Sequence, residues 1–223
     1  MSVEFIPVIT IDGPSGCGKG TIAQKLAKHL HWHWLDSGAL YRILAWAVLH
    51  YQVAPSHDQE LAKLIKRLKI TFTADSEGSA AQMSCDGHDV SHTIRTEACA
   101  KMASEISAKP FVRAALLQMQ RDLRQPPGLV ADGRDMGTVV FTDAVTKFFL
   151  TATAEERARR RHHQLQKLGI LASYPQIYND LVIRDERDRN RPVAPLQAAG
   201  DAIVIDTTHL TIEEVFSKIL NRL

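Results

Sequence analysis

The chain has 223 residues and a formal net charge of +2, and 45% of its residues are hydrophobic. This composition predicts a globular protein that buries a full core, in one domain with elaborations or in two small domains. No apolar run approaches the roughly 20 residues that span a bilayer, and the N-terminus lacks a basic start before a long apolar region. We therefore expect a cytoplasmic protein without a membrane partner.

The cysteines and the charges argue against further classes of protein. Three cysteines without CxxC spacing argue against a disulfide framework and against a zinc site. The small net charge argues against a nucleic-acid partner, which would require an overall basic face with interleaved aromatics. The arginines are nevertheless concentrated at 157–161, at 184–191 and at Arg121 and Arg124. Such clusters without a net excess indicate small anionic ligands.

The first predicted elements are a buried strand over 8–11, a Gly-rich loop and a helix with apolar residues at 22, 26 and 30. The loop consists of Gly13, Pro14, Ser15, Gly16, Cys17, Gly18, Lys19, Gly20 and Thr21. A loop between a strand and a helix directs backbone N–H groups and the positive end of the helix dipole at a phosphate chain, with Lys19 above it. We therefore expect a binding loop for a nucleoside triphosphate, with a plain Gly-rich turn as the alternative.

A second strand-loop-helix unit follows, with a strand that ends at Asp36 and a helical apolar stripe over 40–48. Ser37 and Arg42 would sit at the strand end, where the arginine can bind a phosphate through two parallel N–H bonds. A helix cap with a surface arginine is the alternative interpretation.

The middle of the chain changes pattern. A helix over 61–68 precedes short alternating segments near 70–72, 83–85 and 89–91, with turn residues between them at 75–78 and 86–88. These segments predict a small antiparallel sheet inserted between helices, because helical spacing returns from residue 98 and continues to the Pro-Pro-Gly at 126–128.

Two further buried strands are predicted over 129–132 and 145–150. The first leads into Asp132, Gly133, Arg134 and Asp135, where two carboxylates flank an arginine. A carboxylate can accept a hydrogen bond from an exocyclic amine while the arginine donates to ring or phosphate oxygens, so this turn suits a nucleotide. Asp132 could instead help to organise Mg²⁺, and a plain turn is the third interpretation.

The C-terminal part contains two predicted capping boxes, Thr153 with Glu156 before an arginine-rich helix and Thr211 with Glu214 before the last helix, which follows a strand over 202–205. The βα alternation predicts a parallel sheet with phosphate chemistry at the carboxyl ends of its strands.

One helix face carries a possible ligand-binding set. Arg184, Asp188 and Arg191 share a face by the i, i+4, i+7 spacing, so they could contact one ligand. The alternative is a solvated helix with ion pairs, and the same two interpretations hold for the arginines of 157–161.

Four segments, GPSGCGKGT, LDSGALYR, ADGRDMGTVVF and RDERDRNR, occur in that order, and together they resemble the bacterial cytidylate kinases over nearly the full chain. The resemblance implies an α/β P-loop fold of three layers, α/β/α, with a parallel five-stranded core sheet, a helical lid and an inserted monophosphate-binding domain that contains a small antiparallel sheet. It places the core at about 1–57, 108–152 and 192–223, the insert at about 58–107 and the lid at about 153–191.

The resemblance also implies an activity: transfer of the γ-phosphoryl group of ATP to CMP or dCMP, giving CDP or dCDP plus ADP. Mg²⁺ would be held mainly through phosphates and water, with no residue of the chain assigned as a metal ligand, and a monomer is expected.

The resemblance also assigns the site residues. The catalytic residues would be Lys19, Arg134, Arg184 and Arg191. The ATP contacts would be loop residues 13–21 with Arg157 and Arg161, and the acceptor contacts would be Asp36, Ser37, Tyr41, Arg42, Ser104, Arg113, Asp132, Arg134, Asp135, Arg184, Asp188 and Arg191. Within that set, the CMP phosphate would be held by Ser37, Arg42, Arg134 and Arg191. The cytosine ring would be recognised by Ser104, Arg113 and Asp135. The sugar would be contacted by Arg184 and Asp188.

Three other functions compete. A kinase for another small acceptor, such as AMP, UMP or shikimate, would share Lys19 without the whole set of acceptor motifs. A nucleotide-dependent switch is disfavoured because the chain has no Asn/Thr-Lys-x-Asp segment for guanine. A nucleic-acid-binding protein would show an aromatic and basic surface pattern, which is missing from the sequence.

Overall fold

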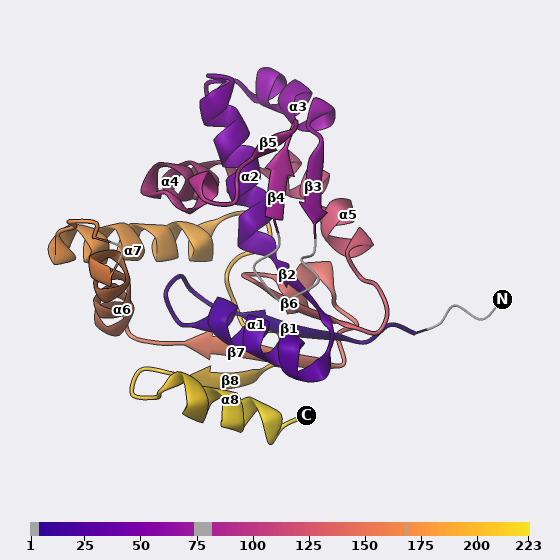
Figure 1. Ribbon diagram of the computed structural model, residues 1–223, viewed down its shortest axis with the longest axis vertical. Coiled ribbons are helices and arrows are strands. Elements are labelled where there is room, and N and C mark those ends of the chain that lie inside the picture. The colour runs from indigo at the N-terminus through magenta and orange to yellow at the C-terminus, as the bar shows by residue number, and fades with distance from the viewer. Residues whose placement is uncertain (1–4, 74–81, 168) are drawn as a thin grey trace. The chain divides into compact units, whose positions relative to one another are not determined.

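The computed structural model describes residues 5–73, 82–167 and 169–223 (Figure 1). The chain forms two compact units, one of Met1–Asp36 with Gln120–Leu223 and the other of Ser37–Met119. The second unit thus includes 37–57 and 108–119, which the family resemblance assigned to the core. Its role as a monophosphate-binding domain, and that of 153–191 as a lid, stay predictions.

The first unit is built on a five-stranded sheet with the strand order β2-β6-β1-β7-β8. All neighbouring strands pair in parallel, which confirms the predicted sheet. The strands are β1 (Val8–Asp12), β2 (His33–Asp36), β6 (Leu129–Gly133), β7 (Thr146–Thr151) and β8 (Ile203–Asp206). Every residue of β1 and β6 is buried, so these strands form the middle of the core, and their carboxyl ends lie at one edge.

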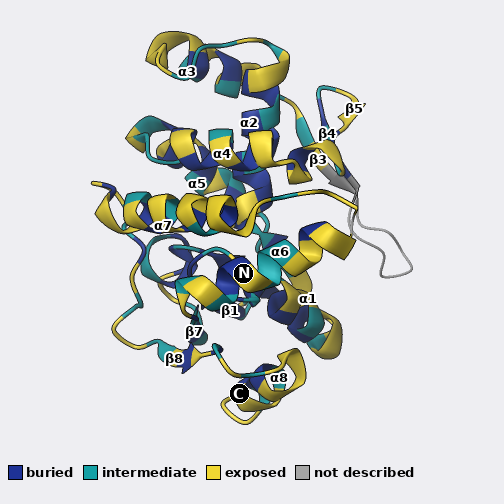
Figure 2. Cartoon of the chain, turned by 90° about the vertical axis from the view of Figure 1, so that its left-hand side faces the viewer, coloured by how far each residue is buried: buried dark blue, intermediate teal, exposed yellow. Residues whose placement is uncertain are grey.

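Helices and one π-helix accompany this sheet. They are α1 (Lys19–Leu30), the π-helix η2 (Met136–Val140), α6 (Ala154–Lys167), α7 (Tyr174–Asn190) and α8 (Ile212–Leu220). Helix α1 is buried at Ile22, Ala23, Leu26 and Ala27, and Figure 2 shows it with one buried and one exposed side. That buried stripe packs in one core cluster with Ile11 and Phe148 of the sheet and Val215 of α8. The helical spacing seen in the sequence therefore fixes how α1 covers the sheet.

The two predicted capping boxes turn out differently. At α8 the Thr211 hydroxyl accepts from the Glu214 N–H and the Glu214 carboxylate accepts from the Thr211 N–H, so that box is confirmed. At α6 only half forms: Thr153 accepts from the Glu156 N–H, but its own N–H donates to Thr208. The prediction of a complete box there is wrong, because the Glu156 carboxylate is bound by two arginines of its own helix instead.

Helices α6 and α7 pack against each other around a small core of their own. Ala158 and Leu165 of α6 cluster with Ile177 and Leu181 of α7. A proline in the first turn helps to start α7, where the missing N–H costs no intrahelical bond.

The second unit combines helices with a small sheet. The three-stranded sheet has the order β3-β4-β5 and both pairings are antiparallel, as predicted. The predicted turn at 75–78 lies outside the described residues. The elements are α2 (Ser37–His50), α3 (Asp58–Arg67), β3 (Ile70–Thr73), β4 (Gln82–Cys85), β5 (His88–Asp89), the 3-10 helix η1 (Thr93–Arg95), α4 (Glu97–Ile106) and most of α5 (Pro110–Asp122). Its core includes Ile43 and Leu44 of α2 and Ile106 of α4.

Candidate active site

The Gly-rich loop lies between β1 and α1, at the carboxyl edge of the sheet. Gly13 has φ 150°, and a Cβ there would lie 2.0 Å from the carbonyl oxygen of Leu150 on β7. Gly16 has φ 81°, and a Cβ there would lie 3.1 Å from Cβ of Arg157. Both positions therefore exclude other residues, and the loop is packed tightly against its neighbours. Such packing fixes the direction of the loop N–H groups before any ligand arrives.

Lys19 is the first residue of α1, and its side chain is buried. Its ammonium donates to the carbonyl oxygen of Pro14 at 3.2 Å, across the loop. Burial, followed by the positive charge of Arg134, lowers the pKa of Lys19. An incoming polyphosphate would supply the negative charge that this buried ammonium lacks.

Two carboxylates lie side by side at the same sheet edge. Asp36 ends β2 and is in register with Asp132 on β6. Asp132 is buried and accepts from the indole N–H of Trp34 at 2.9 Å. Burial, followed by the negative charge of Asp36, raises the pKa of Asp132 to about 7. A Cβ on Gly20 would lie 3.8 Å from Asp132 Oδ2, so this carboxylate adjoins the first turn of α1.

These carboxylates fit a hydrated Mg²⁺. Among the described residues no group of three or more His, Cys, Asp or Glu side chains is arranged to hold a metal ion. Mg²⁺ usually keeps several waters and is bound by one or two carboxylates together with substrate phosphates. Asp36 and Asp132 supply two carboxylates next to the phosphate loop. Burial disfavours the charged form of Asp132, and a nearby cation would favour it.

An ionic cluster joins the turn after β6 to the end of α7. Arg134 Nε donates to Asp188 Oδ2 at 2.8 Å, and Arg191 lies 3.9 Å from the other oxygen of Asp188. Arg191 also lies 3.8 Å from Asp135 Oδ1. Burial acts to raise the pKa of Asp188, but the charges of Arg134 and Arg184 hold it below its usual value.

The cluster shows that Asp188 pairs with an arginine outside α7, and a ligand contact on this face of α7 stays a prediction. Asp188 and Arg191 are only 4% and 6% exposed, so neither side chain is simply solvated. The structure therefore brings together Arg134, Asp135, Asp188 and Arg191, which the sequence placed in two separate motifs.

The arginines of α6 bind the backbone of the phosphate loop. Arg157 is buried and donates to Ser15 O at 3.0 Å and to Ala152 O at 3.0 Å. Arg160, another of the arginines of 157–161, donates to Cys17 O at 3.4 Å and to the Thr207 hydroxyl at 3.2 Å. Arg161 donates to Gln164 Oε1 on its own helix. A contact of Arg157 or Arg161 with ATP stays a prediction.

Asp12 is a buried carboxylate at the same sheet edge that the sequence did not reveal. It ends β1, is 4% exposed, and accepts the N–H groups of Met136 and Gly137. Burial is the main cause that raises the pKa of Asp12 to about 6. Its position as the last residue before Gly13 was the available signal, but its partners lie more than a hundred residues away in sequence.

The second unit positions the remaining predicted residues on its own helices. Ser37 and Tyr41 are buried on α2, Ser104 is buried on α4, and Arg113 is buried on α5. The Arg113 guanidinium lies over the Tyr41 ring, 5.5 Å from its centroid, and donates to Ser107 O at 3.2 Å. Two predicted residues from separate helices are thus in contact, while Arg42 is half-buried on α2.

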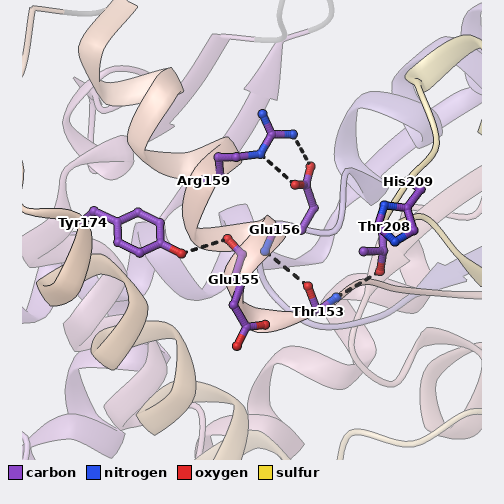
Figure 3. Close-up of a pocket in the computed structure, with 7 residues that line it drawn as sticks. All are labelled: Thr153, Glu155, Glu156, Arg159, Tyr174, Thr208 and His209. Carbon is purple, nitrogen blue, oxygen red and sulfur yellow. Dashed lines mark hydrogen bonds and ion pairs between the residues drawn. The ribbon is translucent and has the colours of Figure 1, made fainter.

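An open pocket of about 300 Å³ lies elsewhere on the first unit, between the start of α6, the start of α7 and the loop after β8 (Figure 3). Its lining residues are Thr153, Glu155, Glu156, Arg159, Tyr174, Thr208 and His209. None of the predicted site residues lines it. Figure 3 shows that its polar groups already pair with one another, as Arg159 does with Glu156 and Tyr174 with the carbonyl of Glu155.

The comparisons with known proteins agree with the four motifs. The family model described as cytidylate kinase matches residues 9–223. The chain belongs to the cytidylate kinase family. A protein named cytidylate kinase from Coxiella burnetii (strain RSA 493 / Nine Mile phase I) is 55% identical over 215 residues, covering 96% of this chain and 91% of the relative. Another of that name from Aeromonas salmonicida (strain A449) is 54% identical over 217 residues, covering 97% and 94%.

Membership of the cytidylate kinase family agrees with the sheet and the loop described above. The resemblance inferred from the sequence is thereby confirmed, and so is the P-loop α/β fold with its parallel core sheet and small antiparallel sheet.

Proposed function

We propose that the chain transfers the γ-phosphoryl group of ATP to CMP or dCMP, giving CDP or dCDP and ADP. The observation that carries this proposal is the buried Lys19 in a tightly packed phosphate loop, with the ionic cluster of Arg134, Asp188 and Arg191 on the same unit. Membership of the cytidylate kinase family supports the choice of acceptor.

The donor phosphates would bind at the N-terminus of α1. The loop N–H groups and the helix dipole supply partial positive charge there, and Lys19 adds a full charge. Bound Mg²⁺ would neutralise charge on the phosphates, with Asp36 and Asp132 holding its water molecules. The proposal includes ATP as the phosphoryl donor and Mg²⁺ as the metal ion bound with it.

The acceptor would be held by charge and read by hydrogen bonds. Arg134, Arg184 and Arg191 would balance the monophosphate and the transferred group, and Asp188 would contact the sugar. Asp135 would accept a hydrogen bond from the exocyclic amine of cytosine, a donor that uracil lacks. In the second unit, Ser37 and Arg42 are assigned to the CMP phosphate and Ser104 and Arg113 to cytosine, with Tyr41 as a support.

Catalysis would need no strong general base, because the acceptor is already a phosphate oxyanion. The chain would act by aligning two anions and by offsetting the charge on the transferred group. Arg134 and Arg191 are suited to that task because their guanidinium groups are already held by Asp188 in fixed positions. A preset position avoids reorganisation at the moment of transfer.

Binding by calorimetry tests this assignment without relying on turnover. We expect CMP and dCMP to bind at least about tenfold more tightly than UMP, because a site built for hydrogen bonds rejects a ligand that lacks the partner group. Equal affinity for CMP and UMP would contradict the cytosine assignment. Tight binding of AMP or shikimate instead would favour a kinase for another small acceptor.

The cytoplasm and a monomeric state complete the proposal. In the described parts of the chain no helix has both the length and the apolarity needed to cross a membrane. The cysteines are buried free thiols, which suits a reducing compartment.

A further inference from the structure

We propose that Asp12 is a positioning residue for the acceptor site: its carboxylate fixes the turn of Arg134 and Asp135 to the strand that enters the phosphate loop. The inference rests on the proposed function and deepens it, because Asp12 would act on the acceptor through that turn.

The turn lies beside Asp12 at both of its ends. On one side, Gly133 at the end of β6 is the register partner of Asp12 in the parallel pair β1 and β6. On the other side, the Asp12 carboxylate accepts the Met136 N–H at 2.9 Å through Oδ1 and the Gly137 N–H at 2.8 Å through Oδ2. Arg134 and Asp135 are the only residues between these two attachments, so small movements of Asp12 would move both side chains.

The π-helix that follows the turn begins on this carboxylate. The first N–H groups of a helix have no intrahelical acceptor, and Asp12 supplies an acceptor for two consecutive ones. Close packing reinforces the attachment, since a Cβ on Gly137 would lie 2.9 Å from Thr10 Oγ1 and 3.1 Å from Lys147 Cδ. The start of η2 therefore lies directly against β1 and β7.

A buried carboxylate is a costly way to hold a helix end. Asp12 is 4% exposed, and burial raises its pKa to about 6, with the nearby negative charge of Asp135 adding to the shift. Lys19 acts in the opposite direction, favouring the charged form. An amide would avoid this cost but has a single acceptor oxygen, so it could hold only one of the two N–H groups. The carboxylate therefore contributes more to the position of the turn than to the free energy of unfolding.

The test compares Asp12→Asn with Asp86→Asn. Asp86 is a matched control because its carboxylate also accepts a backbone N–H, from Lys69 at 2.8 Å, within the second unit and apart from the proposed contacts. For Asp12→Asn we expect kcat to fall about 10- to 100-fold, since a displaced catalytic group costs up to about a hundredfold, and the KM for CMP to rise more than the KM for ATP. The thermal midpoint should stay within about 5 °C of the wild type, because the lost hydrogen bond is offset by the lost buried charge.

Amide hydrogen exchange supplies a readout that does not depend on catalysis. The peptide over 134–141 should exchange at least about tenfold faster in Asp12→Asn than in the wild type or in Asp86→Asn, because one N–H loses its acceptor. Should Asp12→Asn fail to fold, Gly137→Ala displaces the same helix start while the carboxylate remains, and it should raise the KM for CMP in the same way.

The outcomes separate this inference from the proposed function. Suppose that the wild type phosphorylates CMP and that Asp12→Asn has unchanged kinetics. This result would overturn the role of Asp12 but not the proposed function, and the same holds for Gly137→Ala where it replaces Asp12→Asn. A large drop in thermal midpoint with unchanged kinetics at low temperature would do the same, because it is the mark of a purely structural role. A wild type that does not phosphorylate CMP would overturn the proposed function, and unchanged exchange over 134–141 would then still contradict the positioning role.

Discussion

The guanidinium of Arg157 forms two hydrogen bonds with the carboxylate of Asp185, at 3.2 Å and 2.5 Å, and a third with the carbonyl of Ser15 at 3.0 Å. The two side chains are 3% and 4% exposed, so the pair is fully desolvated. One buried ion pair thus joins α6 and α7 to the phosphate loop.

Removing one partner of this pair should strongly destabilise the protein. We expect Asp185→Ala to lower the free energy of unfolding by about 3 kcal/mol or more, because it leaves a buried guanidinium without its counter-charge. Urea denaturation measures the change. Glu186→Ala, at the exposed neighbouring position, should change it by less than about 0.5 kcal/mol. A loss below about 1 kcal/mol for Asp185→Ala would contradict the importance of the pair.

Lys19 should be required for turnover but not for folding. We expect Lys19→Ala to lower kcat by at least about 100-fold, because it removes a preset charge from the developing phosphoryl charge. Its thermal midpoint should change little, since the lost ammonium makes one hydrogen bond, to the Pro14 carbonyl. The ADP-release rate at saturating nucleotides is the measurement, and near-normal turnover would remove Lys19 from the mechanism.

Asp135 should set the choice of base. We expect Asp135→Asn to lower the ratio of kcat/KM for CMP over UMP by about tenfold or more, because an amide can donate to the uracil carbonyl as well as accept. The ratio, rather than the absolute rate, is the informative quantity, since Asp135 also lies near Arg191. An unchanged ratio would show that another residue reads the base.

The free energy of unfolding should decrease as the pH rises from 3.8 to about 7. The pKa of Asp132 is raised from 3.8 to about 7 in the folded protein, so the folded state keeps a proton that the unfolded chain has released. Its contribution to stability is fully present below 3.8 and is lost as the pH rises to about 7. Asp12, with its pKa raised to about 6, acts in the same direction over a narrower range.

Asp132→Asn isolates the larger of these effects. Relative to the wild type, this variant should gain more than about 1 kcal/mol of unfolding free energy between pH 5 and pH 8, since one unit of pKa shift corresponds to about 1.4 kcal/mol. Urea denaturation at the two pH values gives the comparison. Asp180→Asn on the exposed side of α7 should show no such gain. A gain of the same size in both variants would refute the role of the buried carboxylate.

The sequence predicted those parts of the fold whose signals are local. The phosphate loop, the parallel strands and the small antiparallel sheet were predicted correctly, because a buried strand, a Gly-rich turn and a helical stripe follow one another directly in the chain. Arg184 and Asp188 lie in α7 as predicted, but Arg191 follows the end of the helix with extended backbone, so the prediction of a shared helix face is wrong for Arg191.

What the sequence did not show depends on distant partners. Asp12 bonds to Met136, 124 residues away, and nothing near Asp12 indicates that contact. Glu156 had two available partners, a helix N-terminus and arginines of its own helix, and only packing decides which it binds. The π-helix at Met136–Val140 likewise starts with two N–H groups bound to Asp12, a partner that its own residues do not indicate.

The most direct test of the central claim is a coupled ADP-release assay with ATP, Mg²⁺ and, in turn, CMP, dCMP, UMP, AMP, GMP and shikimate. We predict turnover mainly with CMP and dCMP, and little ADP release without an acceptor. Efficient turnover of a different acceptor, or ADP release that is independent of any acceptor, would contradict the proposed function.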